Sequence, residues 1–366
     1  MNLNEKALLW LDLFEFLTIN KKYKLLEFFN NPEDIFSEFN DYESDYIDFK
    51  ILTKEQFNNL SKKLDAKIVD KYLKQYEELG IKVITYYSNE YPEQFKNYDN
   101  PPLTLYLKGD ISLLKSRCVA VIGTRKVTRY GERVTEKYVE VLSKNGLTIV
   151  SGMASGVDSI AHKTALKNKG KTIAVLGGGI EAIYPKTNIG LSKEIAENGL
   201  LVSEYAPWVK AATYHFPVRN RIIVGLCEAT LITEAGIKSG VMHSKNYCLD
   251  YGKELFVVPG NIDSPYCAGC NEILKSMQGA ITTKPQDILE SLGIRNQVIK
   301  KVQTKQYSDG ENLILDILKS DEVHFDELLN KTKLDTKVLL RLLTTMELSG
   351  IIKKLAGNFY CRIMED

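Results

Sequence analysis

The feature that most constrains the fold is a series of short, mainly apolar runs between residues 118 and 260. The six runs read "CVAVIG", "LTIVSG", "TIAVLGGG", "GLLVSE", "ATLITEAG" and "ELFVVPG". Continuous rather than alternating apolar strands are buried on both faces, as in a parallel sheet covered by helices. Helical stretches separate the runs, and most runs end in a glycine turn. The pattern predicts an α/β fold with a Rossmann-like parallel-sheet core, whose ligand site lies at the carboxyl ends of the strands.

Two helical regions flank this core. Residues 1–75 combine helical apolar spacing with polar breaks and are rich in Phe and Tyr, which predicts a small helical domain. The last 55 or so residues show the order helix, helix, helix, hairpin, which is typical of a winged helix. We therefore predict a helical domain at 1–75, a core at 80–293, a linker at 294–311 and a winged-helix domain at 312–366.

Charge is distributed unevenly along the chain. The net charge is only +1, but residues 115–292 hold 22 Lys and Arg against 16 Asp and Glu, whereas residues 1–75 hold 11 against 14. A basic segment in an otherwise neutral chain favours an anionic ligand for the core.

The N-terminus lacks the pattern of a signal peptide, and no apolar run reaches the roughly 18 residues that span a bilayer. The six cysteines are scattered over a long chain, which is typical of a reducing compartment. Cys267 and Cys270 form a C-x-x-C pair, but its spacing to His243 and Cys248 is irregular for zinc. These features predict a cytoplasmic protein with no membrane contact and no metal.

Two common phosphate motifs are absent from the sequence. The nearest approach to a Walker A motif is "KGKT" at 169–172, where Ala165 occupies the position of the required glycine. The first strand–helix turn, "VIGTRKVTRYG", is not G-x-G-x-x-G, so no dinucleotide cofactor is expected. His162, one turn into the following helix, is interpreted as a core histidine, and no catalytic residue is predicted.

Other turns carry candidate phosphate ligands. Arg125 lies two residues after Gly123, at the end of the first strand. Gly152 has no side chain to cover the backbone N–H groups before the next helix, and a helix N-terminus can bind phosphate. The third turn, "GGGIEAIYPKTN", ends in Asn188.

The stretch "FPVRNRII" places Arg219 and Arg221 on either side of Asn220, close to Phe216. Two cations beside an apolar segment are costly to desolvate unless an anion lies near them. Either carboxylates of the chain neutralise them, with Glu204, Glu228 and Glu234 as candidates, or a polyphosphate ligand does. Arginines beside an exposed aromatic ring are typical of single-stranded nucleic acid sites, and we favour that interpretation.

These motifs, taken together and in this order, resemble the DNA-processing protein A family (DprA, also called Smf). The resemblance rests on G-T-R at 123–125, "SGMASGVDSIAH", "TIAVLGGGIEAIYP", "FPVRNRII", "EAGIKSG" and "FVVPG", and it covers residues of about 80–292. It implies an extended Rossmann core that binds single-stranded DNA, a SAM-like N-terminal helical domain and a C-terminal winged helix. The implied DNA-binding residues are Arg125, Gly152, Asn188, Phe216, Arg219, Asn220 and Arg221.

The resemblance also implies a function without catalysis or cofactor. A family member protects incoming single-stranded DNA and loads the RecA recombinase during natural transformation and recombination, acting as a homodimer. One departure is the segment after Ser239 and Gly240, where the family usually has a small residue and then Thr-Ala and this chain has "VMHSKN".

Two alternatives remain open for the core. One is an enzyme related to nucleoside-monophosphate phosphoribohydrolases, whose signature P-G-G-x-G-T-x-x-E is only partly matched by "EAGIKSG". The other is a nucleotide-sensing Rossmann module. Release of base from AMP would identify the enzyme.

Overall fold

The computed structural model describes residues 1–295, 307–318 and 322–363. The chain divides into two compact units, Met1–Val298 and Ile299–Asp366. Within the described residues, none of the helices is long and apolar enough to cross a membrane.

The first unit is built on a nine-stranded sheet with the order β1-β2-β6-β5-β4-β3-β7-β8-β9. Strands β3 to β9 run parallel to one another, and β2 pairs antiparallel with β6 and with the edge strand β1. The six predicted apolar runs form β3 to β8, so the predicted parallel core is confirmed. The strands are β1 Lys82–Thr85, β2 Thr104–Gly109, β3 Cys118–Ile122, β4 Thr148–Ser151, β5 Thr172–Leu176, β6 Leu200–Ser203, β7 Ala229–Ile232, β8 Glu254–Val257 and β9 Ala280–Ile281.

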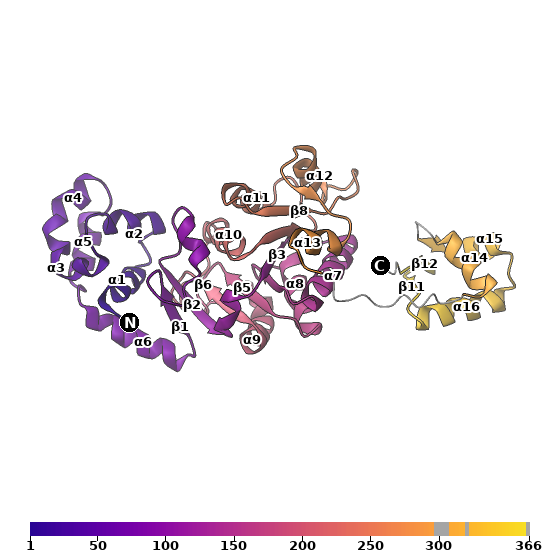
Figure 1. Ribbon diagram of the computed structural model, residues 1–366, viewed down its shortest axis with the longest axis horizontal. Coiled ribbons are helices and arrows are strands. Elements are labelled where there is room, and N and C mark those ends of the chain that lie inside the picture. The colour runs from indigo at the N-terminus through magenta and orange to yellow at the C-terminus, as the bar shows by residue number, and fades with distance from the viewer. Residues whose placement is uncertain (296–306, 319–321, 364–366) are drawn as a thin grey trace. The chain divides into compact units, whose positions relative to one another are not determined.

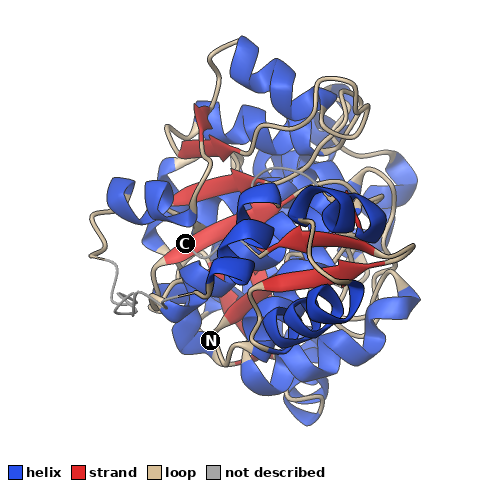
Figure 2. Cartoon of the chain, turned by 90° about the vertical axis from the view of Figure 1, so that its right-hand side faces the viewer, coloured by secondary structure: helices blue, strands red, loops and turns tan. Residues whose placement is uncertain are grey.

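Helices cover both faces of this sheet, as Figure 2 shows. Alternate residues of one strand reach opposite faces, so Ala120 packs in one cluster with Ile222 of α10, and Val119 in another with Tyr138 of α7. The core helices are α7 Arg129–Lys144, α8 Val157–Lys167, α9 Ile189–Asn198, α10 His215–Leu226, α11 Val241–Asp250, α12 Ala268–Lys275 and α13 Pro285–Ser291 (Figure 1). Burial on both faces explains why these strands are apolar throughout.

The strand order fixes where ligands can reach the backbone. The chain leaves β3 toward β4, β5 and β6 and then returns to the other side of β3 as β7. The carboxyl ends of parallel strands around such a reversal form the usual ligand crevice of a doubly wound sheet. Here they carry the turns that contain Gly123, Gly152 and Gly177.

The N-terminal residues fold as helices, as predicted: α1 Leu3–Asp12, α2 Ile19–Leu26, α3 Ile35–Glu38, α4 Glu43–Asp48, α5 Lys54–Ser61 and α6 Ala66–Glu78. They do not form an isolated core. Leu11 and Tyr76 share one buried cluster with Tyr106 of β2 and Leu201 of β6. The N-terminal helices and the sheet therefore belong to the same compact unit.

The second unit has the predicted winged-helix order. It contains α14 Asp309–Ile317, β10 Val323–His324, α15 Phe325–Thr332, α16 Thr336–Leu348, β11 Ile352–Leu355 and β12 Phe359–Arg362, with the strand order β10-β12-β11. The side chain of Asp335 caps α16 by accepting a hydrogen bond from the Lys337 N–H. Most of the predicted linker, residues 296–306, lies outside the described residues.

Candidate nucleic-acid interface

An exposed cation and two aromatic rings meet at the carboxyl ends of β3 and β5. The guanidinium carbon of Arg125, in the loop after β3, lies 5.2 Å from the ring centroid of Phe216 at the start of α10. The ring of Tyr184, in the loop after β5, lies 5.8 Å from that of Phe216, centroid to centroid. Arg125 is exposed, Tyr184 is 56% exposed and Phe216 is half-buried. We call these three residues the Arg125–Phe216–Tyr184 surface.

Gly177 allows Phe216 to lie close to the end of β5. A Cβ atom at this position would lie 2.7 Å from Cδ1 of the Phe216 ring, closer than real side chains approach. The glycine turn after β5 therefore sets the position of the aromatic ring.

Arg219 braces the turn after β4 from inside the protein. Its Nη1 donates to the carbonyl oxygen of Gly152 at 2.6 Å and also to that of Val175. A Cβ atom on Gly152 would lie 2.5 Å from Nη2 of Arg219, so the turn needs glycine there. Arg219 is only 4% exposed, and burial lowers its pKa to about 10, an effect that the carboxylate of Asp158 opposes. The guanidinium thus supports the backbone and does not face solvent.

Asn188 also supports the turn after β4. Its side-chain amide donates to the carbonyl oxygen of Met153 at 2.8 Å and to Oγ of Ser159 at 2.9 Å. Asn188 is 6% exposed. It therefore fixes the conformation of the turn instead of presenting its amide at the surface.

Arg221 forms an internal ion pair. Its Nη2 donates to Oε1 of Glu204 at the end of β6, and both side chains are less than a tenth exposed. In an α-helix, residues two apart point in nearly opposite directions, about 200° around the axis, so Arg219 and Arg221 cannot face the same ligand. This corrects the expectation that one polyphosphate ligand binds both arginines. The sequence left open whether a carboxylate of the chain or a ligand neutralises these arginines. For Arg221, the anion is the carboxylate of Glu204.

The other two candidate carboxylates have different partners. Glu228 forms a bidentate pair with Arg117, whose Nε and Nη2 lie 2.9 and 2.6 Å from its oxygens. Glu234 accepts hydrogen bonds from the Thr128 N–H at 2.8 Å and the Thr128 hydroxyl at 2.6 Å.

The Glu234 contact bears on nucleotide binding. Thr128 caps α7, and the Glu234 carboxylate lies at the N-terminus of that helix, between β3 and β7 where the sheet order reverses. A Cβ atom on Gly131, in the first turn of α7, would lie 2.4 Å from Oε2 of Glu234. A helix N-terminus at this position is the usual phosphate site of nucleotide-binding Rossmann folds. Here an internal carboxylate occupies it.

The seven predicted site residues thus separate into two groups. Arg125 and Phe216 lie at the surface together with Asn220, which is partly exposed and accepts a hydrogen bond at Oδ1 from Nε of Arg219. The buried group consists of Gly152, Asn188, Arg219 and Arg221. Tyr184 was not among the predicted residues, since its place in an irregular loop gives no periodic signal.

His162 lies in the interior, as interpreted from the sequence. Its Nδ1 lies 2.7 Å from Oγ1 of Thr172, and burial lowers its pKa to about 3, so it stays neutral. The described residues contain no group of three or more His, Cys, Asp or Glu side chains that would hold a metal ion.

Comparison with protein families identifies the core. The family described as DNA recombination-mediator protein A matches residues 82–293, which is more than half of the chain. The chain belongs to this family. The DprA winged helix domain matches residues 300–358 as well. The family expected from the sequence motifs is therefore confirmed.

Curated members of the DNA recombination-mediator protein A family are similar over the same region. The DNA processing protein DprA of Bacillus subtilis is 39% identical over 225 residues, which cover 61% of this chain and 75% of that protein. DprA of Streptococcus pneumoniae is 40% identical over 54% of this chain and 70% of its own length. Protein Smf of Escherichia coli is 41% identical over 56% of this chain and 55% of its own length.

Two solved structures of the family resemble this one. The X-ray structure of S. pneumoniae DprA has a TM-score of 0.65 at 31% identity and covers 78% of this chain and 97% of that one. A DprA structure from Helicobacter pylori, described as showing a single-stranded DNA binding mode, has a TM-score of 0.54 at 36% identity and covers 58% of this chain and 95% of that one.

Proposed function

We propose that this protein binds single-stranded DNA at the Arg125–Phe216–Tyr184 surface and acts as a recombination mediator. The observation that carries the proposal is the exposed guanidinium of Arg125 over the ring of Phe216, beside the exposed ring of Tyr184. A cation next to stackable rings suits a strand whose phosphates and unpaired bases are both accessible. The bases of a duplex are stacked on one another and would not reach these rings.

In the proposed complex, Arg125 leaves the Phe216 ring and pairs with a phosphate, and the ring accepts a base. Arg125 can make this change because its side chain is exposed. Asn220, which is partly exposed and lies one turn after Phe216 in α10, would bind the strand in exchange for its 3.5 Å contact with the carbonyl oxygen of Gly240. Gly152, Asn188 and Arg219 act indirectly, since they hold the turn after β4 in shape.

We propose no catalysis. The nucleotide-processing alternative needs room for a phosphate where the sheet order reverses, and the carboxylate of Glu234 lies there within hydrogen-bond distance of Thr128. A nucleotide phosphate would have to displace the Glu234 carboxylate, which already accepts the hydrogen bonds that Thr128 donates. This arrangement favours DNA binding over the two nucleotide alternatives.

The relatives named DNA processing protein DprA support a role in DNA processing. We propose that this protein protects incoming single strands and loads RecA on them during natural transformation and recombination, in the cytoplasm. Loading is tested by following the assembly of RecA on a labelled single strand with and without the protein.

The DNA-binding proposal is tested by titrating the protein with labelled oligo-dT, with a duplex of the same length and with AMP. We expect tight binding of oligo-dT, weaker binding of the duplex and no release of adenine from AMP. Free adenine would support the phosphoribohydrolase, and equal binding of duplex and single strand would contradict the stacking role of Phe216.

The winged helix is expected to add little to this affinity. The third helix of this unit, α16, exposes Lys337 and Arg341, but also Leu340, which is 46% exposed, and Leu348, which is 85% exposed. A helix that reads DNA usually carries a more basic face. Deletion of residues 300–366 should therefore leave the Kd for oligo-dT within a few-fold of wild type, as measured by fluorescence anisotropy. A large loss of affinity would place the main DNA contact in the winged helix.

A homodimer is part of the proposal. Sedimentation at micromolar concentration should give a species of about twice the chain mass of 41.5 kDa. The segment "VMHSKN", which departs from the family pattern, begins α11; His243 and Asn246 are exposed and accessible to a partner, whereas Val241 and Ser244 are buried. Sedimentation of a single species near 41.5 kDa would contradict the dimer.

A further inference from the structure

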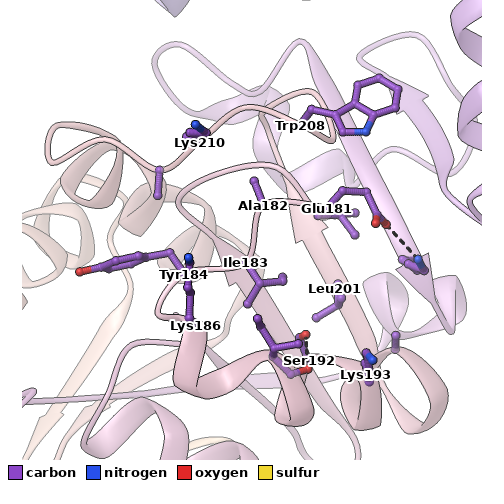
Figure 3. Close-up of a pocket in the computed structure, with 15 residues that line it drawn as sticks. Glu181, Ala182, Ile183, Tyr184, Lys186, Ser192, Lys193, Leu201, Trp208 and Lys210 are labelled. Atoms are coloured by element: carbon purple, nitrogen blue, oxygen red, sulfur yellow. Dashed lines mark hydrogen bonds and ion pairs between the residues drawn. The ribbon is translucent and has the colours of Figure 1, made fainter.

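A groove continues from the Arg125–Phe216–Tyr184 surface. It has a volume of about 670 Å³ and lies between the loop after β5, the loop after β6, helix α9 and strand β2. Figure 3 shows Tyr184 and Trp208 at opposite ends of the groove, with Ile183 and Leu201 between them. We call this cavity the Trp208 groove.

The walls of the groove carry positive charge. Four lysines line it, Lys108, Lys186, Lys193 and Lys210, against the single carboxylate of Glu181. Glu181 pairs with Lys108 at 3.1 Å. In the part of the chain that the structure describes, no carboxylate lies within ion-pair distance of the other three lysines. Three cations are therefore free to bind an anion.

Exposed aromatic rings mark both ends of the groove. Trp208 is 48% exposed, although its ring also contacts that of Tyr76 with the centroids 5.7 Å apart. Tyr184 is 56% exposed and belongs to both the groove and the surface around Phe216. Unpaired bases stack on such rings, and lysines between them can neutralise phosphates.

We propose that single-stranded DNA runs from Phe216 across Tyr184 into the Trp208 groove, where Trp208 stacks on a base and Lys186, Lys193 and Lys210 neutralise the phosphates between. This inference rests on the proposed function and adds a second segment to the binding path. It implies that a long strand uses both segments, whereas a strand of a few nucleotides uses only the surface around Phe216.

Tryptophan fluorescence provides a direct test because the chain contains only two tryptophans. Trp10 is 0% exposed and donates its Nε1–H to the carbonyl oxygen of Lys63 at 2.7 Å, so DNA cannot stack on it. A long oligo-dT should quench the fluorescence of wild type and of Trp10→Phe, and should leave that of Trp208→Phe unchanged. An oligo-dT of a few nucleotides should quench none of them.

The affinities complete the test. Trp208→Ala should weaken binding of the long strand by roughly 5- to 140-fold, the loss expected for one stacked base, and should not change binding of the short strand. Trp208→Phe retains a ring against Tyr76 and serves as the control for folding, with melting curves for each variant. Normal binding of the long strand by Trp208→Ala, or binding of that strand without quenching, would overturn the inference while the site at Phe216 stands. If wild type binds neither strand, the proposed function fails as well.

Discussion

Arg221→Met is expected to lower the free energy of unfolding of the first unit by about 3–5 kcal/mol, the usual effect of removing one partner of a buried ion pair. The change leaves the Glu204 carboxylate, which is 8% exposed, without its cation. Both tryptophans lie in residues 1–298, so urea unfolding followed by tryptophan fluorescence reports on this unit alone. An unfolding curve like that of wild type would show that the pair does not stabilise the fold.

The matched controls separate the ion pair from simple loss of packing. Glu204→Leu should destabilise the protein to a similar extent, since it leaves Arg221 as an unpaired buried cation. The double variant Arg221→Met, Glu204→Leu should recover part of the loss, because no charge then remains in the interior. Additive effects of the two single changes would contradict the pairing.

Phe216→Leu and Arg125→Gln are expected to lower affinity for oligo-dT without lowering stability. Loss of the Phe216 ring removes base stacking worth roughly 1–3 kcal/mol, or about 5- to 140-fold in Kd, and should leave the salt dependence unchanged. Loss of the Arg125 charge removes one phosphate contact and should reduce the salt dependence. Titration by fluorescence anisotropy, with melting curves alongside, measures both effects. A Phe216→Leu protein that melts early and binds normally when folded would assign the ring a structural role only.

The sheet could be predicted from the sequence because each core strand is buried on both faces. Runs such as "CVAVI" and "TIAVL" lack the regularly spaced polar residues of a surface strand or an amphipathic helix, so they cannot be mistaken for either. The winged helix could also be predicted, because Asp335 and Gly350 mark the two ends of its third helix. The packing of the N-terminal helices against the sheet could not be predicted. The contact between Tyr76 of α6 and Tyr106 of β2 depends on the order of the strands in the sheet, which the sequence pattern does not reveal.

The roles of the arginines could not be predicted without the helix. Pro217 lies in the first turn of α10, where proline is tolerated, but a Phe-Pro pair gave no helical signal. Once α10 is known, the spacing of Arg219 and Arg221 alone places them on opposite sides. The choice of Glu204 among three carboxylates depends on strand order, which local sequence does not encode. Tyr184 and Trp208 lie in loops without periodicity, so only their positions in space reveal a common groove.

The salt dependence of oligo-dT binding by Arg125→Gln tests most directly whether DNA binds at the carboxyl ends of these strands. Its control is Lys167→Gln, which removes an exposed cation from the last turn of α8, just before the chain enters the amino end of β5. We predict that the slope of log K against log salt becomes less negative by about 0.7 for Arg125→Gln, the value for one phosphate contact on a single strand, and stays at the wild-type value for Lys167→Gln. Equal slopes for wild type and Arg125→Gln would contradict a phosphate contact by Arg125 and would place the DNA elsewhere on the protein.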